Sequence, residues 1–498
     1  MNLLKDIQTP QQVDTTIKEY IEDFECSALR ESMRHGEAYY RNKNTEIMER
    51  KMLIYTEDED SGAPIEMEDP YKANNKLPSG FLKILVDQKV NYSLGNPITV
   101  ESNNTDLFDL VVGKRFETNL KQIAKEASKK AIGWAHVYID EAGAFKIMKV
   151  PSEQVIPVYN TYNDEKLEMV IRYYSVQTQD AQGKKVMVNR VEVWDETTVT
   201  YYQESTETGT YYLLSEEDMH NIFNIVYTNP KYHFEKKIAY GSTTQREGVS
   251  WSMIPFIPLY NNDEELTDLN PVKNYIDVYD IVESDFANNF EDFQDMYWIL
   301  KGYNGESVAQ FLSQVKRYKT LNVSDEGDAR AEKIDVPYQA RMAELDNLET
   351  KIYNFGMGFN PNQLGDGNIT NVVIKSRFAN LDLKASQFEQ EVHDFIEKLI
   401  EFVNFYVEMS GLGQPVELED VVFNRSILVN ESELLDSNSK QKGVISEETR
   451  LSNHPWVDNV EDEMERMEEE KEANLENIQD LNLGPQEEGE GDEPGQEV

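Results

Sequence analysis

The residues best suited to metal chemistry in this sequence lie near its three-quarter point, where Asp366 opens the stretch DGNITN. EF-hand calcium loops open with oxygen ligands at alternate positions, and they require a glycine at the sixth position and a glutamate at the twelfth. Here the sixth position is Asn371 and the twelfth is Arg377. A guanidinium cannot replace the bidentate carboxylate, so the sequence argues against a calcium site.

Other catalytic or metal-binding patterns are missing from the sequence. No GxxxxGK[ST] motif is present, which excludes a P-loop ATPase. No HExxH motif is present, and the only cysteine is Cys26, so neither a thiolate metal site nor an intrachain disulfide is expected. We therefore expect no catalytic residue, no metal and no cofactor. The six histidines are interpreted as structural or solvated; they are His35, His136, His220, His233, His393 and His454.

The charge of the chain narrows the function classes further. Its 498 residues include 93 acidic and 48 basic side chains, giving a formal net charge of -45. Such a chain repels other polyanions at long range, so a basic DNA-binding footprint is not expected. Paired carboxylates arise by chance at this content, and we interpret them as solvated acidic faces. No apolar stretch reaches about 18 residues and no signal peptide is visible, which predicts a cytosolic or assembly-compartment protein without a membrane segment.

The N-terminal half combines helices with strands. Apolar residues recur every four positions from Leu82 to Leu94 and predict a helix that Gly95 and Pro97 stop. A second helix is expected over residues 107–133. Alternating and β-branched runs then predict one antiparallel sheet over residues 134–214, followed by an irregular region to residue 262.

Long helices dominate the second half. Apolar spacings of three and four predict helices over residues 269–297, 338–359 and 388–409. The insertion at 298–337 reads as strand, short helix, strand, and the insertion NPNQLGDGNIT begins at Asn360. Gly411 is expected to stop the third helix. A strand over residues 420–430, an acidic helix with a thin apolar seam and a disordered Gly/Glu/Pro tail complete the chain.

Five segments, taken in order, resemble the portal proteins of tailed bacteriophages, in particular those of siphophages of Gram-positive hosts. The resemblance runs from about Asn74 to the acidic tail. The segments are NNKLPSGFLKILVDQKVNYSLGNPITV, IPFIPLYNNDEELTDLNPVKNYIDVYDIVESDFANNFEDFQDMYWILKGYNGE, AEKIDVP, LDLKASQFEQEVHDFIEKLIEF and GVISEETRLSNHPWVDNVEDEMERMEEE.

The resemblance implies an α+β, ring-forming portal fold that is mostly helical. It assigns the chain as follows: a wing at 1–262, completed by a strand near 421–428; a first stem helix at 263–297; a clip of α/β type at 298–337; a second stem helix at 338–359; a tunnel loop at 360–371; a long tunnel/wing helix at 372–411; a wing return at 412–439; crown helices at 440–481; and a disordered acidic tail at 482–498.

The function that the resemblance implies is structural. Family members form a ring, typically of twelve subunits, at one capsid vertex, through which double-stranded DNA is packaged and ejected. The implied partners are further copies of the chain, double-stranded DNA, the terminase packaging motor, the head-tail adaptor protein, and the major capsid and scaffold proteins. The implied location is the virion, after assembly in the host cytoplasm.

The resemblance also selects site residues. The tunnel loop that faces DNA is expected to comprise Asn360, Pro361, Asn362, Gln363, Leu364, Gly365, Asp366, Gly367, Asn368, Ile369 and Thr370. Lys375 and Arg377 are candidates for sparse phosphate contacts, with salt bridges to acidic neighbours as the alternative. The basic cluster Lys316, Arg317 and Lys319 is a candidate partner contact of the clip, with plain solvation as the alternative.

Two other classes of function stay open from the sequence. A nuclease or protease of the same assembly set would need a clustered catalytic constellation, and none is visible. A head-tail adaptor or a scaffold-like assembly protein would be non-enzymatic, like a portal protein, but adaptors are generally shorter and scaffolds more uniformly helical. Activity assays on the purified chain separate the portal hypothesis from the first class, and ring stoichiometry with a central channel separates it from the second.

Overall fold

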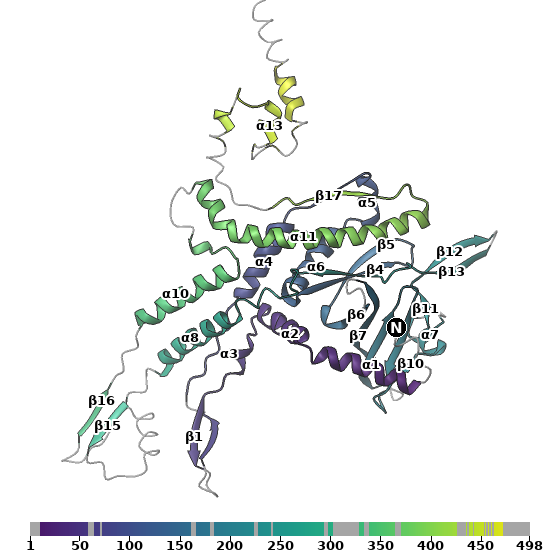
Figure 1. Ribbon diagram of the computed structural model, residues 1–498. Helices are drawn as coiled ribbons and strands as arrows, with labels where there is room; N and C mark the ends of the chain where they lie inside the picture. The colour runs from purple at the N-terminus through teal and green to yellow at the C-terminus, as the bar shows by residue number, and fades with distance from the viewer. Residues whose placement is uncertain are drawn as a thin grey trace, which may run out of the picture. The chain divides into compact units, whose positions relative to one another are not determined.

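The computed structural model describes a mixed α+β protein, as predicted (Figure 1). In the part described, the strand pairs are antiparallel and no helix is long and apolar enough to cross a membrane. The chain divides into two compact units, Met1–Pro361 with Phe378–Ser426, and Asn362–Arg377 with Ile427–Val498. The described residues are 10–57, 64–69, 72–160, 166–179, 184–223, 228–240, 243–292, 297–301, 328–332, 338–363, 370–425, 435, 438–441, 443–452, 454, 457, 460 and 463–471.

The first unit begins with three helices and a hairpin. Helix α2 starts after Ser27, whose hydroxyl accepts a hydrogen bond from the Arg30 backbone N–H and so caps the helix. The hairpin that follows α3 extends away from the helices (Figure 1). The elements are α1 (Pro10–Glu25), α2 (Ala28–Tyr40), α3 (Thr45–Glu49), β1 (Leu53–Glu57) and β2 (Pro64–Glu68).

The helix predicted before Gly95 is confirmed as α4 (Phe81–Leu94), and most of its side chains are buried. The single helix predicted over residues 107–133 is wrong, because the chain forms α5 (Thr105–Val112) and α6 (Phe116–Lys130). Gly113 separates them with φ +71°, a conformation that no α-helix continues through. Helix α2 crosses α6 at Gly36, where the backbones meet without an intervening side chain.

Two antiparallel sheets replace the single sheet predicted over residues 134–214. The smaller has the order β14-β4-β5, and the larger has the order β10-β9-β8-β7-β6 with β11 paired to β9. Alternation marks strands but not their partners, and β14 comes from far along the chain. The strands are β4 (Ile132–Ile139), β5 (Phe145–Val150), β6 (Val155–Tyr159), β7 (Leu167–Gln179), β8 (Lys185–Trp194), β9 (Thr198–Glu204), β10 (Tyr211–Leu213), β11 (Lys231–Tyr232) and β14 (Phe256–Tyr260), with a 3-10 turn η1 (Ser152–Gln154).

The region predicted to be irregular up to residue 262 is also corrected. It contains α7 (Glu216–Phe223) and a hairpin of β12 (Phe234–Tyr240) and β13 (Thr243–Val249). The hairpin strands carry two lysines, an arginine, two glutamates and other polar residues in place of the apolar alternation that marks a strand. Pro258 lies in β14 opposite Trp134, at the sheet edge where a missing N–H is tolerated.

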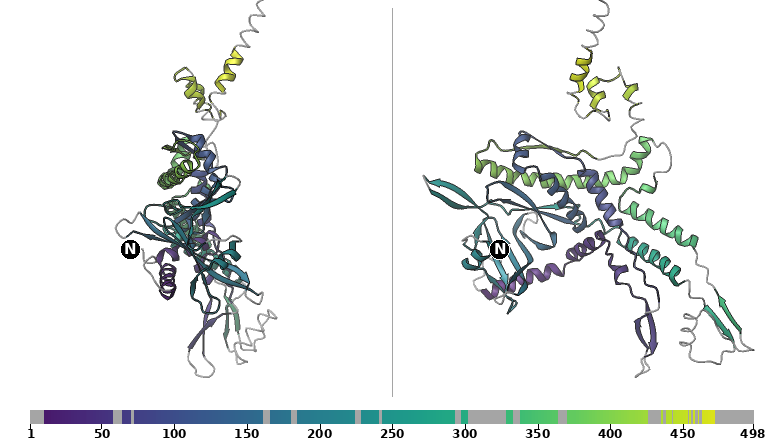
Figure 2. Two further views of the ribbon diagram at one scale, coloured as in Figure 1. Left: turned by 90° about the vertical axis from the view of Figure 1, so that its right-hand side faces the viewer. Right: turned by 180° about the vertical axis from the view of Figure 1, so that it is seen from behind.

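Helices α8 (Lys273–Asp292) and α10 (Tyr338–Phe355) lie side by side (Figures 1 and 2). Both are shorter than predicted. Tyr297, the expected end of the first, instead begins β15 (Tyr297–Lys301), which pairs with β16 (Asp328–Glu332). The short helix expected between these strands lies outside the described residues. The second helix ends at Phe355 because Gly356 and Met357, with φ +53°, turn the chain out of the helix.

The third long helix is confirmed as α11 (Asn371–Ser410), and Gly411 ends it with φ +64°, as predicted. Its buried face, including Phe388, Val392 and Phe395, packs into a core shared with α4 and α6. Strand β17 (Leu418–Val422) pairs with β3 (Thr99–Ser102). The expected strand thus starts slightly earlier than predicted and ends at Val422, and the predicted stretch from residue 426 lies outside the described residues.

One acidic face predicted to be solvated is instead buried. Side chains spaced along α8 accept hydrogen bonds from backbone N–H groups of the extended segment that precedes α4. The bonds are Ser79 to Asp280 at 2.9 Å, Leu77 to Ser284 at 3.0 Å and Asn75 to Asn288 at 2.7 Å. Burial and the nearby Asp277 carboxylate raise the pKa of Asp280 against the lowering effect of its hydrogen bonds. The helix thus satisfies backbone donors that no strand pairs.

In the second unit, the described elements include α13 (Glu447–Ser452) and a helical stretch at residues 463–471. The Ser446 hydroxyl accepts a hydrogen bond from the Thr449 backbone N–H at 3.2 Å, which is the geometry of a helix N-cap. The tail predicted to be disordered at 482–498 lies outside the described residues.

Candidate functional site

The candidate site is the connection between α10 and α11, whose start packs closely against α4. A Cβ atom added at Gly356 would lie 2.7 Å from Leu85 Cδ1, and one added at Gly358 would lie 2.3 Å from Leu85 Cδ2. At such distances the Leu85 side chain would have to shift, so the two glycines let the backbone lie directly on it.

The side chain of Gln88 on α4 binds the backbone of Phe359, the residue after Gly358. The Gln88 side-chain amide donates to Phe359 O at 2.7 Å, and its Oε1 accepts from Phe359 N–H at 3.1 Å. The amide therefore satisfies both backbone groups of Phe359, as a neighbouring strand would. The next side chain, Asn360, is only 7% exposed and donates to Glu349 on α10 at 3.1 Å.

An aromatic stack joins the two ends of the connection. The ring of Phe359, at its start, stacks on Phe378 of α11 with centroids 4.3 Å apart and an interplanar angle of 17°. Phe378 in turn stacks on Tyr92 of α4 at 5.9 Å and 24°. Stacked pairs of this kind add to the free energy gained by burying the rings.

A buried charge cluster lies beside the same connection. Asp268 pairs with Lys89 at 2.9 Å and with Lys384 at 3.2 Å, and its side chain is 3% exposed. Lys384 also donates to Gly356 O at 2.9 Å, and the amide of Asn261 donates to Asp268 at 3.1 Å. The cluster thus links α4, α11, the segment before α8 and the end of α10.

The pKa values of Lys89 and Asp268 in this cluster are both lowered, for different reasons. Burial lowers the pKa of Lys89 to about 8, although Asp268 favours its charged form. Burial would raise the pKa of Asp268, but the ammonium groups of Lys384 and Lys89 lower it to about 2. At neutral pH Lys89 and Asp268 are therefore both charged, and the one carboxylate pairs with two lysine side chains.

An arginine after β17 fastens the returning chain to α11. Arg425 contacts Glu389 through its Nε at 2.9 Å and through a terminal nitrogen at 2.5 Å, and another nitrogen pairs with Asp382. Its hydrogen bonding with Glu389 raises the already high pKa of the guanidinium. The Tyr92 hydroxyl donates to the same Asp382 carboxylate at 3.0 Å.

Replacement of Arg425 by alanine (R425A) is expected to lower the free energy of unfolding by about 2–3 kcal/mol, because it leaves the nearly buried Glu389 without its cation. Urea unfolding of the purified protein measures this change. The matched control is R246A, which removes the solvent-exposed pair with Glu235 and should cost less than about 1 kcal/mol. An equal loss in both variants would contradict the anchoring role of Arg425.

The structure separates the residues predicted for this site. Asn360 is buried at the start of the connection, whereas Pro361, Asn362, Thr370 and Lys375 are exposed. Gln363 ends a 3-10 turn η2 (Pro361–Gln363). Arg377 is partly buried, and one of its terminal nitrogens finds no hydrogen-bond partner within the described part of the chain. The other predicted site residues lie outside the described residues: Leu364, Gly365, Asp366, Gly367, Asn368, Ile369, Lys316, Arg317 and Lys319.

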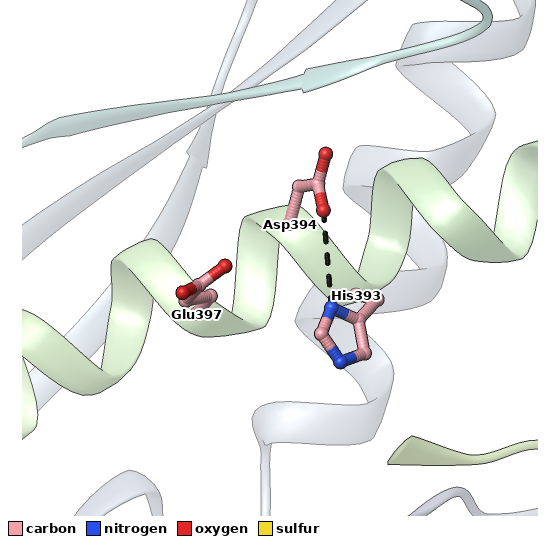
Figure 3. A group of neighbouring side chains, drawn as sticks. All are labelled: His393, Asp394 and Glu397. Carbon is pink, nitrogen blue, oxygen red and sulfur yellow. Dashed lines mark ion pairs between the residues drawn. The ribbon is translucent and has the colours of Figure 1, made fainter. Parts of the chain in front are cut away.

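A group with metal-ligand chemistry lies elsewhere on α11. The ligand atoms of His393, Asp394 and Glu397 lie within 4.8 Å of one another, and the closest ion pair, His393 Nδ1 to Asp394, spans 3.8 Å (Figure 3). Both carboxylates are solvent-exposed and the imidazole is partly so. Exposed acidic side chains on one helix face are common without a metal, and we assign no metal site to them.

Sequence analysis missed the residues that anchor the connection. Gln88, Lys384 and Arg425 are single polar residues whose partners are distant in the sequence, and no local motif marks them. Lys89 did carry a signal, since it lies on the apolar stripe of α4, three positions after Val86. A charged residue on a buried stripe requires a buried partner, although the pattern does not say that the partner is Asp268.

Comparison with known proteins agrees over nearly the whole chain. The model of the family described as phage portal protein, SPP1 Gp6-like, matches residues 27–477. The portal protein of Clostridium phage phiCD119 is 29% identical over 475 residues, which cover 91% of this chain and 96% of that relative. The portal protein of Bacillus phage SPP1 is 28% identical over 453 residues, which cover 88% and 84% respectively.

One similar solved structure is described as the neck of a native GTA particle computed with C12 symmetry. It matches 74% of this chain and 87% of its own chain at 9% identity, with a TM-score of 0.36. The family match, which covers most of the sequence, is the finding that decides the identity. This chain therefore belongs to the SPP1 Gp6-like family of phage portal proteins.

Proposed function

We propose that this chain assembles into a homo-oligomeric ring of twelve subunits at one vertex of a phage capsid, around a channel through which double-stranded DNA is packaged and ejected. The observation that carries the proposal is the portal family match across residues 27–477. Portal proteins of this family are non-enzymatic structural components of the virion. The ring also serves as the docking site for the terminase motor and later for the head-tail adaptor, while capsid and scaffold proteins surround it.

The parts of the ring follow the assignments made from the sequence. We assign α8 and α10 to the stem, β15 and β16 to the clip, and the sheets with α4 to α6 to the wing. The pairing of β17 with β3 supports the return of the chain to the wing after α11. Residues 360–371 form the tunnel loop, and the described helices beyond residue 440 belong to the crown.

The charge of the chain suits a conduit. A ring of subunits that each carry a formal charge of -45 repels phosphate, and repulsion keeps a moving duplex from adhering to the wall. Each cation that neutralises a phosphate adds affinity through counterion release, so such contacts should be few. Lys375 is exposed just after the proposed loop, and Arg377 follows it by two residues. We propose these two residues as the sparse phosphate contacts.

Electron microscopy of the purified full-length protein tests this function. We expect class averages along the particle axis to show closed rings with a channel wide enough for a ~20 Å duplex. Monomers at every salt concentration, also in the presence of the capsid and scaffold proteins, would contradict the ring. A particle that lacks a continuous channel would instead favour a scaffold-like assembly protein.

A further inference from the structure

We propose that Gln88 is a positioning residue that fixes the base of the tunnel loop by holding the backbone of Phe359 beside Phe378. The proposal rests on the proposed function, because it assigns the base of the loop that faces the channel. It concerns only described residues on either side of the connection.

One face of α4 contacts both ends of the connection. Gln88 binds the backbone of Phe359 at the outgoing end, and Tyr92 stacks on Phe378 at the returning end. Residues four apart on a helix lie on the same side, one turn from each other. Since α4 is buried in the main core, it provides a fixed platform for both ends.

The two ends of the connection are also fixed to each other. The stack of Phe359 on Phe378 closes the base, and Lys384 holds Gly356 O from the α11 side. The division of the chain into two compact units agrees independently, since its boundaries fall between Pro361 and Asn362 and between Arg377 and Phe378.

The consequence is that the base of the connection lies within one compact unit, which contains Phe359, the buried Asn360 and Phe378. Lys375 and Arg377 belong to the other unit and are not part of the base.

Hydrogen exchange measured by mass spectrometry on the assembled full-length protein tests the proposal. In Q88A, peptides that cover residues 354–363 should exchange about tenfold faster, because the Phe359 N–H loses its acceptor. Q88M keeps the length of the side chain without its polar groups and should behave like Q88A. The matched control is N91A, on the exposed side of the same helix, which should exchange like the wild type.

The outcomes separate this proposal from the ring function. Wild-type exchange in Q88M would overturn it, because packing alone would then hold the base. An equal rise in exchange throughout the wing would also overturn it, since Gln88 would then act as an ordinary stabilising residue. If Q88A rings form normally and the local rise is observed, packaging assays should give fewer DNA-filled heads. Absence of wild-type rings would contradict the proposed function. The exchange of residues 354–363 in the variants would still test whether Gln88 fixes the base.

Discussion

Replacement of Asp268 by asparagine (D268N) is expected to lower the free energy of unfolding by about 3–5 kcal/mol at pH 7. The variant keeps the size of the side chain but leaves Lys89, which is 1% exposed, and Lys384 without their shared counter-ion. A buried ammonium group that loses its partner must either stay charged at high cost or release its proton. Urea unfolding of the wild type and the variant measures the difference.

The pH dependence of the same pair of proteins provides a second check. The folded-state pKa of Lys89 is about 8, below its ordinary value of 10.5, so the unfolded chain binds more protons between these values and wild-type stability should rise with pH across that window. In D268N the pKa of Lys89 falls further, so the pH range over which stability rises begins at lower pH. The free energies of unfolding of the two proteins should therefore differ less at pH 9 than at pH 7. If the free energies of unfolding differed equally at both pH values, the assignment of Asp268 as the counter-ion of Lys89 would be contradicted.

The Asp268 carboxylate should contribute to the free energy of unfolding only above acidic pH. Its folded-state pKa is about 2, below that of a free aspartate at ~3.9. The stability it contributes is therefore present above pH ~4 and is lost as the pH falls toward 2. The control variant is D87N, also involving α4, where the pair with Lys125 is partly exposed and should contribute less than about 1 kcal/mol.

Replacement of Gly36 by alanine (G36A) should destabilise the protein by about 3 kcal/mol or more. An added Cβ would lie 1.8 Å from the carbonyl oxygen of Lys129, which is backbone and cannot turn aside. The helices α2 and α6 would have to separate, and the ion pair between Glu37 and Lys129, now 2.8 Å, would be lost with them. Thermal unfolding should show a clear fall in the midpoint.

The control for this variant is G80A, at the start of α4. There an added Cβ would meet only the Asn42 side chain, at 3.4 Å, which is an ordinary contact. The expected loss is below about 1 kcal/mol, mainly from the poorer N-cap. If G36A were as stable as G80A, the close crossing of α2 and α6 would not be a constraint on the fold.

The sequence predicted the elements whose signal is local. The apolar spacing of α4 and α11, together with Gly95 and Gly411 at their ends, depends on residues within one helix, and both predictions are confirmed. The helix split at Gly113 was missed because the apolar pattern continues across it, while only the backbone conformation breaks. The two sheets were merged because strand alternation carries no information about the distant partner β14.

The candidate site was predictable only in part. The run NPNQLGDGNIT announces a connection between two helices by its composition, but which residues anchor it depends on contacts between distant elements. Asn360 has the same residue type as Asn362, yet it is buried and donates a hydrogen bond to Glu349, six residues before the end of α10. Gln88 carries no signal in the sequence because it binds the backbone of Phe359. A backbone partner is the same for every residue type, so no pair of residue types marks the contact.

The pairing of β17 with β3 also bears on when the subunit can finish folding. Asn103, just after β3, and Glu417, just before β17, are 314 positions apart and hydrogen-bond to each other at 2.9 Å. At about 5–20 residues per second, roughly 15–60 s of translation separate the two strands. Until then β3 is an unpaired edge that can pair with other nascent chains. Pairing of β3 with β17 is therefore a late event of synthesis, and this part of the fold is complete only after most of the chain has been made.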